Sequence, residues 1–115
     1  MWKMSHFMVE IPAAEIAEFC RRWRIHELAV FGSALREDFG PESDVDFLVE
    51  FSAGADWGLL DHVRMQGELE TLVQRGVDLV TKRAVERSPN WLRRNEILNS
   101  ARVVFSEREA IDATR

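Results

Sequence analysis

Two aspartates stand at the start of an apolar run, and this combination constrains the fold more than any other stretch of the chain. Asp44 precedes, and Asp46 interrupts, the segment VDFLVEF at residues 45–51. The apolar and aromatic residues of this segment are typical of a buried strand. Carboxylates beside such a strand are costly to bury unless they are paired or bind a metal ion. We therefore expect a counter-charge close to Asp44 and Asp46.

The spacing of the two aspartates indicates the nature of that counter-charge. Side chains alternate along a strand, so Asp44 and Asp46 should point to the same side. Two carboxylates this close repel each other unless a cation lies between them, and hard oxygen ligands suit Mg²⁺. The simpler alternative is a turn aspartate followed by a solvent-exposed carboxylate at a strand edge.

A second feature, the pair Gly32-Ser33, follows a short apolar run at residues 28–31. The run predicts a buried strand, and Gly32 lets the backbone bend and lets a ligand approach closely. Ser33 is a suitable helix N-cap, and the free N–H groups of a helix N-terminus bind anions. Arg36, one turn further on, could reach the same anion. Most Gly-Ser pairs are ordinary turns, so this feature gains weight only from its surroundings.

The third feature is Asp78, within the short apolar segment VDLVT at residues 77–81. If this strand pairs beside residues 45–51, Asp78 can face the same pocket as the other two aspartates. A register shift of one residue would turn it away. Three carboxylates in one pocket could hold metal ions and activate a hydroxyl group for phosphoryl or nucleotidyl transfer. Taken alone, Asp78 is more simply an exposed or hydrogen-bonded carboxylate.

The composition limits the class of protein. The chain has 115 residues, a net charge of −5 and one cysteine, Cys20, which lies on the apolar face of a predicted helix and should be a buried, inert thiol. This length fits one domain, and one cysteine excludes an intrachain disulfide framework. No apolar run could span a membrane and no signal peptide is evident, so we expect a cytoplasmic protein. The basic residues form no stripe, which does not favour direct nucleic-acid binding.

The order of the predicted elements indicates an α/β (α+β) domain. Helical periodicity predicts helices at about residues 12–23, 57–75 and 88–101, with a further helix starting at Ser33. Apolar segments predict strands at residues 28–31, 45–51, 77–81 and 102–105. Such alternation packs helices against one mostly buried sheet. We expect a single domain at residues 1–115, with a motif core at about 25–105 and an N-terminal extension at 1–11.

Several residues of these helices carry specific expectations. Trp23 and Trp91 should contribute to the core. Gly76 should end the second helix, and Ser88 and Pro89 fit the N-cap and first position of the last one. The apolar residues of the second helix should form one buried stripe: Leu59, Leu60, Val63, Leu69, Leu72 and Val73.

Together, the three features resemble the minimal nucleotidyltransferases of the DNA polymerase β-like superfamily. Their signature is Gly-Ser, ten residues, then Asp-x-Asp; here Gly-Ser at 32–33 is followed by residues 34–43 and then by Asp44 and Asp46. The strand with Asp78 looks like the later strand that carries the third carboxylate of that family. The resemblance runs from about residue 25 to 105 and implies the polymerase β-like fold, a small mixed sheet with helices packed on it.

The short form of this motif is most similar to the MntA antitoxins, which are encoded beside HEPN ribonuclease toxins. Those antitoxins transfer AMP from ATP to a tyrosine of the toxin and silence it, so the resemblance implies the same reaction here. Asp44 and Asp46 would bind two Mg²⁺ ions, and Asp78 would share the catalytic ion and accept or orient the proton of the incoming hydroxyl.

The resemblance also assigns the nucleotide side of the site and a partner. Gly32 and Ser33 would hold the triphosphate of ATP, whereas a phosphate contact by Arg36 is our own inference from its spacing. The partner would be the cognate HEPN toxin, in a hetero-oligomer or together with further copies of this chain. Two alternatives stay open: an antitoxin that masks the toxin by binding alone, and nucleotidyl transfer to a small molecule or an RNA end.

Overall fold

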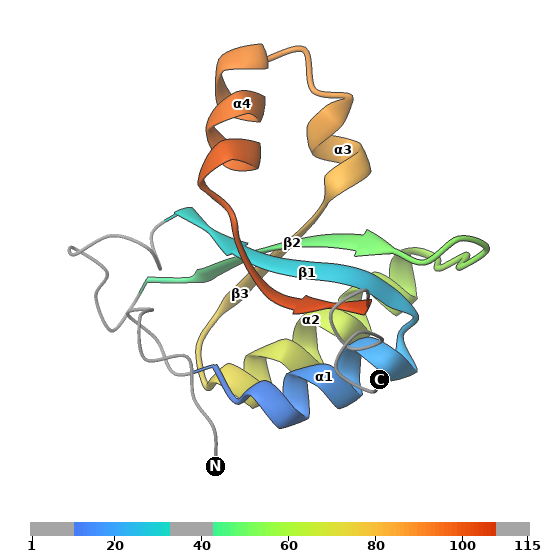
Figure 1. Cartoon of the computed structure of the whole chain (residues 1–115). Helices are drawn as coiled ribbons and strands as arrows, with labels where there is room; N and C mark the ends of the chain where they lie inside the picture. The colour runs from blue at the N-terminus through green and yellow to red at the C-terminus, as the bar shows by residue number, and fades with distance from the viewer. Residues whose placement is uncertain (1–10, 33–42, 108–115) are drawn as a thin grey trace.

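The computed structural model describes residues 11–32 and 43–107 (Figure 1). The helices are α1 (Ala13–Arg22), α2 (Leu59–Val73), α3 (Lys82–Glu86) and α4 (Trp91–Ser100). The strands are β1 (Ile25–Phe31), β2 (Val45–Phe51), β3 (Val77–Thr81) and β4 (Arg102–Ser106). The helix predicted from Ser33 and residues 1–10 of the predicted extension lie outside the described residues.

The strands form one mixed sheet in the order β3-β2-β1-β4. β1 pairs antiparallel with β2 and β4, whereas β2 and β3 are parallel. α1 and α2 cover one face of the sheet, and α3 and α4 stand on the other (Figure 1). This arrangement confirms the predicted α/β class, a small mixed sheet with helices packed on it. Within the described part of the chain, no helix has the length and apolar character that a membrane span requires.

The main core lies between the sheet and the α1–α2 pair. Val45, Phe47 and Val49 of β2 are completely buried in it, as is Phe19 of α1. Ile11 belongs to the same cluster and is completely buried, although the sequence places it in the N-terminal extension. Trp23 packs against this core and makes an edge-to-face contact with Trp57, with ring centroids 5.1 Å apart. The layer is therefore closed by aromatic side chains as well as aliphatic ones.

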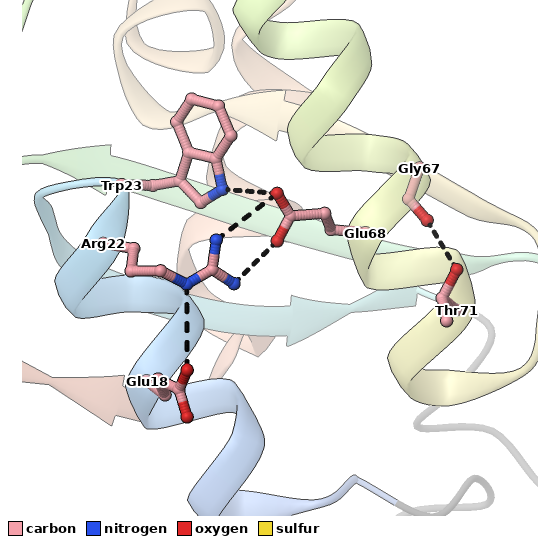
Figure 2. Close-up of polar contacts among 6 residues, drawn as sticks. All are labelled: Glu18, Arg22, Trp23, Gly67, Glu68 and Thr71. Carbon is pink, nitrogen blue, oxygen red and sulfur yellow. Dashed lines mark hydrogen bonds and ion pairs between the residues drawn. The ribbon is translucent and has the colours of Figure 1, made fainter.

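A polar cluster ties α1 to α2 at the surface of that layer (Figure 2). Arg22 Nη2 lies 2.8 Å from Glu68 Oε2, and Trp23 Nε1 donates a hydrogen bond to Glu68 Oε1 at 3.2 Å. The hydrogen bond from Arg22 is the main cause that holds the pKa of Glu68 below its usual range. Because both charged side chains reach solvent, this pair orients the two helices and adds little to stability.

A smaller apolar cluster holds α3 and α4 on the other face of the sheet, and we call residues 82–100 the arm. Two residues of the arm and three of the sheet form this cluster: Val85, Ile97, Ala29, Phe31 and Leu48. The sequence pattern does not predict α3, because five residues are too few to show helical periodicity. Its N-cap is Thr81, whose hydroxyl accepts a hydrogen bond from Ala84 N at 3.1 Å.

The predicted burial of two helical segments is wrong. Leu59, Leu60 and Val63 are exposed by 79%, 75% and 58%, whereas the later residues of the predicted stripe do pack on the core. At about 100° per residue, these three side chains lie on the side of α2 opposite Met65, which faces the core. Trp91 is 58% exposed for a similar reason, since it lies off the face of α4 that packs on the sheet.

Two predicted helix boundaries are wrong as well. Gly76 does not end α2; the residue in the left-handed conformation at that end is Gln74, with a φ of 56°. The Ser-Pro pair at 88–89 does not begin α4. Its N-cap is Asn90, whose side chain accepts a hydrogen bond from Arg93 N at 3.1 Å. A stronger local cap therefore prevails over the proline signal.

Candidate active site

The predicted carboxylates meet at one end of the sheet, where β1 ends and β2 and β3 begin. The strand register places Phe31, Asp46 and Asp78 next to one another in a single row. Their neighbours Val45 and Val77 are buried in the main core, so Asp46 and Asp78 point to the opposite face, which carries the arm. The structure thus brings Asp46 and Asp78 together on adjacent strands. Asp46 is half-buried and Asp78 is exposed.

Asp44 lies one residue before β2, beside the segment that leads into β3. Val45 N donates a hydrogen bond to Gly76 O at 2.8 Å, and Arg75 Nη1 donates one to Ser43 O at 3.2 Å. These two bonds hold the backbone on either side of Asp44. A Cβ atom on Gly76 would collide with the Asp44 carboxylate, so a side chain at this place would force that carboxylate to move.

Gly32 ends β1 beside Asp46. Its φ is 72°, a conformation that favours glycine over all other residues, and an added Cβ atom would collide with Asp46 Oδ2. Two independent constraints therefore require glycine here. Ser33 and Arg36, the other two predicted phosphate-binding residues, lie outside the described residues.

The donor set fits a hard cation such as Mg²⁺. Gly32 and Gly76 each leave the space of a missing side chain next to a carboxylate, which lets these carboxylates lie close to the backbone. Asp44 and Asp46 also interact with other groups of the protein. Within residues 11–32 and 43–107, no three acidic, histidine or cysteine side chains enclose a metal site by themselves. Mg²⁺ commonly keeps substrate phosphates and water among its ligands, in addition to one or two carboxylates.

The sequence analysis missed Gly76 as a residue of this site. Its pattern suggested a helix stop, because glycine after a helical stripe usually has that role. The available signal was its position directly before the strand 77–81, two residues before Asp78. A glycine at that place makes room for a residue on the neighbouring strand. The sequence alone does not show which strand that neighbour is.

Comparisons with known proteins give one family. The family described as Nucleotidyltransferase domain matches residues 14–104. The chain is similar to the protein adenylyltransferase MntA of Thermococcus cleftensis, with 36% identity over 76 residues, which are 66% of this chain and 75% of that protein.

Two solved structures share the fold. One is described as a candidate minimal nucleotidyltransferase; it is 33% identical, with a TM-score of 0.61, over 78% of this chain and 86% of that one. The other is the MNT antitoxin in complex with the tri-AMPylated HEPN toxin of Shewanella oneidensis. It has a TM-score of 0.56 at 14% identity, over 88% of this chain and 75% of that one, which is a likeness of fold alone.

Proposed function

The chain belongs to the nucleotidyltransferase domain family, and we propose that it transfers AMP from ATP to a tyrosine hydroxyl of a cognate HEPN toxin and so neutralises it. The observation that carries this proposal is the row of Asp46 and Asp78, with Gly32 on the other side of Asp46. The similarity to a protein adenylyltransferase supports AMP as the group transferred, and the fold of the MNT–HEPN complex supports a toxin as the acceptor.

In this proposal, three carboxylates hold the metal ions. Asp44, Asp46 and Asp78 would bind two Mg²⁺ ions, which when bound neutralise charge on the phosphates and on the attacking oxygen. The glycines beside Asp44 and Asp46 let these carboxylates lie close to the backbone. Without a counter-charge, three carboxylates at one strand end would repel one another.

The nucleotide lies on the β1 side of this row. Gly32 follows β1 in a left-handed conformation, which turns the backbone toward the predicted helix N-terminus where the phosphates would bind. Ser33 donates a hydrogen bond to the triphosphate, and Arg36 adds a positive charge to the same group. Since β2 separates β1 from β3, a triphosphate bound at Gly32 would be on the opposite side of Asp46 from Asp78.

The acceptor then approaches from the β3 side, where Asp78 lies. Asp78 accepts or orients the proton of the acceptor hydroxyl while that oxygen attacks the α-phosphorus of ATP. A new P–O bond forms, the bond between the α-phosphorus and its bridging oxygen breaks, and pyrophosphate leaves. The acceptor then carries AMP, and its proton passes by way of Asp78 to solvent.

Neutralisation by binding alone is the second candidate. It is favoured by the exposed side chains of Leu59, Leu60 and Val63, because clustered apolar residues on a surface often mark interaction sites. They lie on α2, on the sheet face away from the carboxylates (Figure 1). Binding of the toxin at this surface would not need the aspartates at all.

One experiment separates the two candidates. ATP labelled at the α-phosphate is incubated with Mg²⁺, the chain and the product of the gene next to its own. The wild type should label the partner, whereas Asp44→Ala/Asp46→Ala should not. Asp56→Ala, which changes an exposed aspartate between β2 and α2, is the matched control and should label the partner normally. An unlabelled partner that is still bound and silenced by the double variant would establish masking instead.

A further inference from the structure

A pocket of about 180 Å³ lies between the two helices of the arm and the sheet. It is lined by three larger apolar residues, Val80, Val85 and Ile97, and by three polar ones, Ser88, Arg93 and Arg94. We call it the arm pocket. Its apolar wall is continuous with the cluster that holds the arm on the sheet, because Val85 and Ile97 belong to both.

The arm pocket lies on the acceptor side of the candidate site. Val80 lines it and stands two residues after Asp78 on β3, so both side chains point to the same face of the sheet. β3 is an edge strand, and β2 lies between it and the strand that ends in Gly32. A group in this pocket therefore lies on the same strand and the same sheet face as Asp78, and away from the predicted triphosphate position.

The polar side of the arm pocket suits an anion. Arg93 is exposed and Arg94 half-buried, and neither guanidinium has an acidic partner among the residues that the structure describes. Ser88 Oγ accepts a hydrogen bond from Asn90 N at 3.3 Å, which leaves its own hydrogen to donate. Arginine recognises phosphate oxygens through two parallel N–H groups, and a serine hydroxyl adds a third donor.

The apolar side suits one ring of a flat aromatic base. Cavities of about 150 Å³ lined by aliphatic residues bind benzene, so 180 Å³ is enough for an aromatic group of similar thickness. A ring beside arginines also gains from stacking against guanidinium planes. An aromatic base attached to a phosphate group meets both halves of the pocket at once.

We propose that the arm pocket binds an adenylate already attached to the acceptor, and so prepares that acceptor for a further transfer. This inference rests on the proposed function. The base lies against Val80 and Val85, and the phosphodiester lies at Arg93 and Arg94. A ribose hydroxyl of the bound adenylate then faces Asp78. Its oxygen attacks the α-phosphorus of a new ATP, pyrophosphate leaves and the proton passes to solvent, so each round adds one AMP.

Counting adenylates on the partner by intact-mass spectrometry tests this step. The wild type should add several AMP units, whereas Arg93→Gln/Arg94→Gln should add the first at the wild-type rate and the next at least tenfold more slowly. Arg83→Gln, which changes an exposed arginine of the arm outside the pocket, is the control and should match the wild type. Equal rates for every addition would overturn the proposal. So would a slower first addition with a raised KM for ATP, because the pocket would then serve incoming ATP.

A binding measurement tests the pocket independently of transfer. AMP, added without Mg²⁺ to isotopically labelled protein, should shift the methyl signals of Val80, Val85 and Ile97. The affinity should fall at least tenfold in Arg93→Gln/Arg94→Gln and for adenosine, which lacks the phosphate. Shifts confined to residues near Gly32 and Asp46 would overturn the inference. A wild type that binds AMP in the pocket but labels no partner would refute the proposed function and leave the pocket established.

Discussion

At the scale of single residues, the candidate site depends on glycine, which has no side chain. Gly32 has a φ of 72°, and a Cβ atom there would collide with Asp46 Oδ2. A Cβ atom added to Gly67, in the middle of α2, would have no neighbouring atom within 4 Å outside its own helix backbone. The two glycines therefore differ in their roles. Gly32 makes room for a carboxylate, whereas Gly67 could be replaced by a better helix former without a steric clash.

Alanine at these two positions should act in opposite directions. Gly32→Ala forces a left-handed alanine against Asp46, and we expect a loss of about 1–2 kcal/mol in unfolding free energy together with at least tenfold slower AMP transfer. Gly67→Ala should stabilise the protein by about 1 kcal/mol without changing transfer, since alanine is the better helix former. Urea unfolding and the labelling assay measure both. Equal stability changes at the two positions would contradict this reading of Gly32.

At the scale of elements, α1 places Cys20 between the helix and the sheet. The thiol is completely buried, as expected from its position on the apolar face. Burial raises the pKa of Cys20 to about 12, from its usual 9.0. This thiol is therefore neutral and unreactive at ordinary pH, because the thiolate is the reactive species.

The shifted pKa of Cys20 predicts a pH-dependent stability. The unfolded chain loses this proton near pH 9 and the folded one only near pH 12, so the contribution to stability is complete below pH 9. Between these values the unfolding free energy should fall by up to about 1.4 kcal/mol per pH unit. Cys20→Ala removes the effect. Urea unfolding at about pH 8 and pH 10 should show the wild type losing its advantage over the variant; a constant difference would refute the assignment.

Sequence reasoning was accurate where local patterns decide and failed where distant contacts do. The bounds of β2 are as predicted, since its apolar residues alternate and turn residues flank it. The family prediction is also confirmed, because it rests on a spacing within one stretch. The prediction of which face of α2 is buried was wrong, because Leu59 and Met65 are both apolar. Only packing against the sheet decides which of the two faces is buried. The arm pocket could not be foreseen, since Arg94 and Val80 come to line one pocket only through tertiary folding.

At the scale of the whole molecule, the two faces of the sheet are covered unequally. α1 and α2 close one face with the large cluster that includes Phe19, Phe47 and Leu69. The arm stands on the other face through the five-residue cluster around Ile97. The candidate site and the arm pocket share this thinly covered face, so under the proposed function a movement of the arm would change the side from which the acceptor approaches.

This asymmetry predicts that the arm can open without unfolding the rest of the chain. Ile97→Ala removes the apolar contact of α4, so amide hydrogens of α3 and α4 should exchange at least tenfold faster while those of α1 and β2 stay protected. Leu69→Ala is the matched control in the main core; it should cost about 2–5 kcal/mol and lower protection in α1, α2 and the sheet together. Hydrogen exchange read by NMR distinguishes the two patterns. Uniform loss of protection in Ile97→Ala would mean that the arm and the core unfold as one unit. In that case the arm pocket could not open without unfolding the strands that carry the carboxylates. Variants that lower the free energy of unfolding would then also lower the affinity of the pocket for AMP.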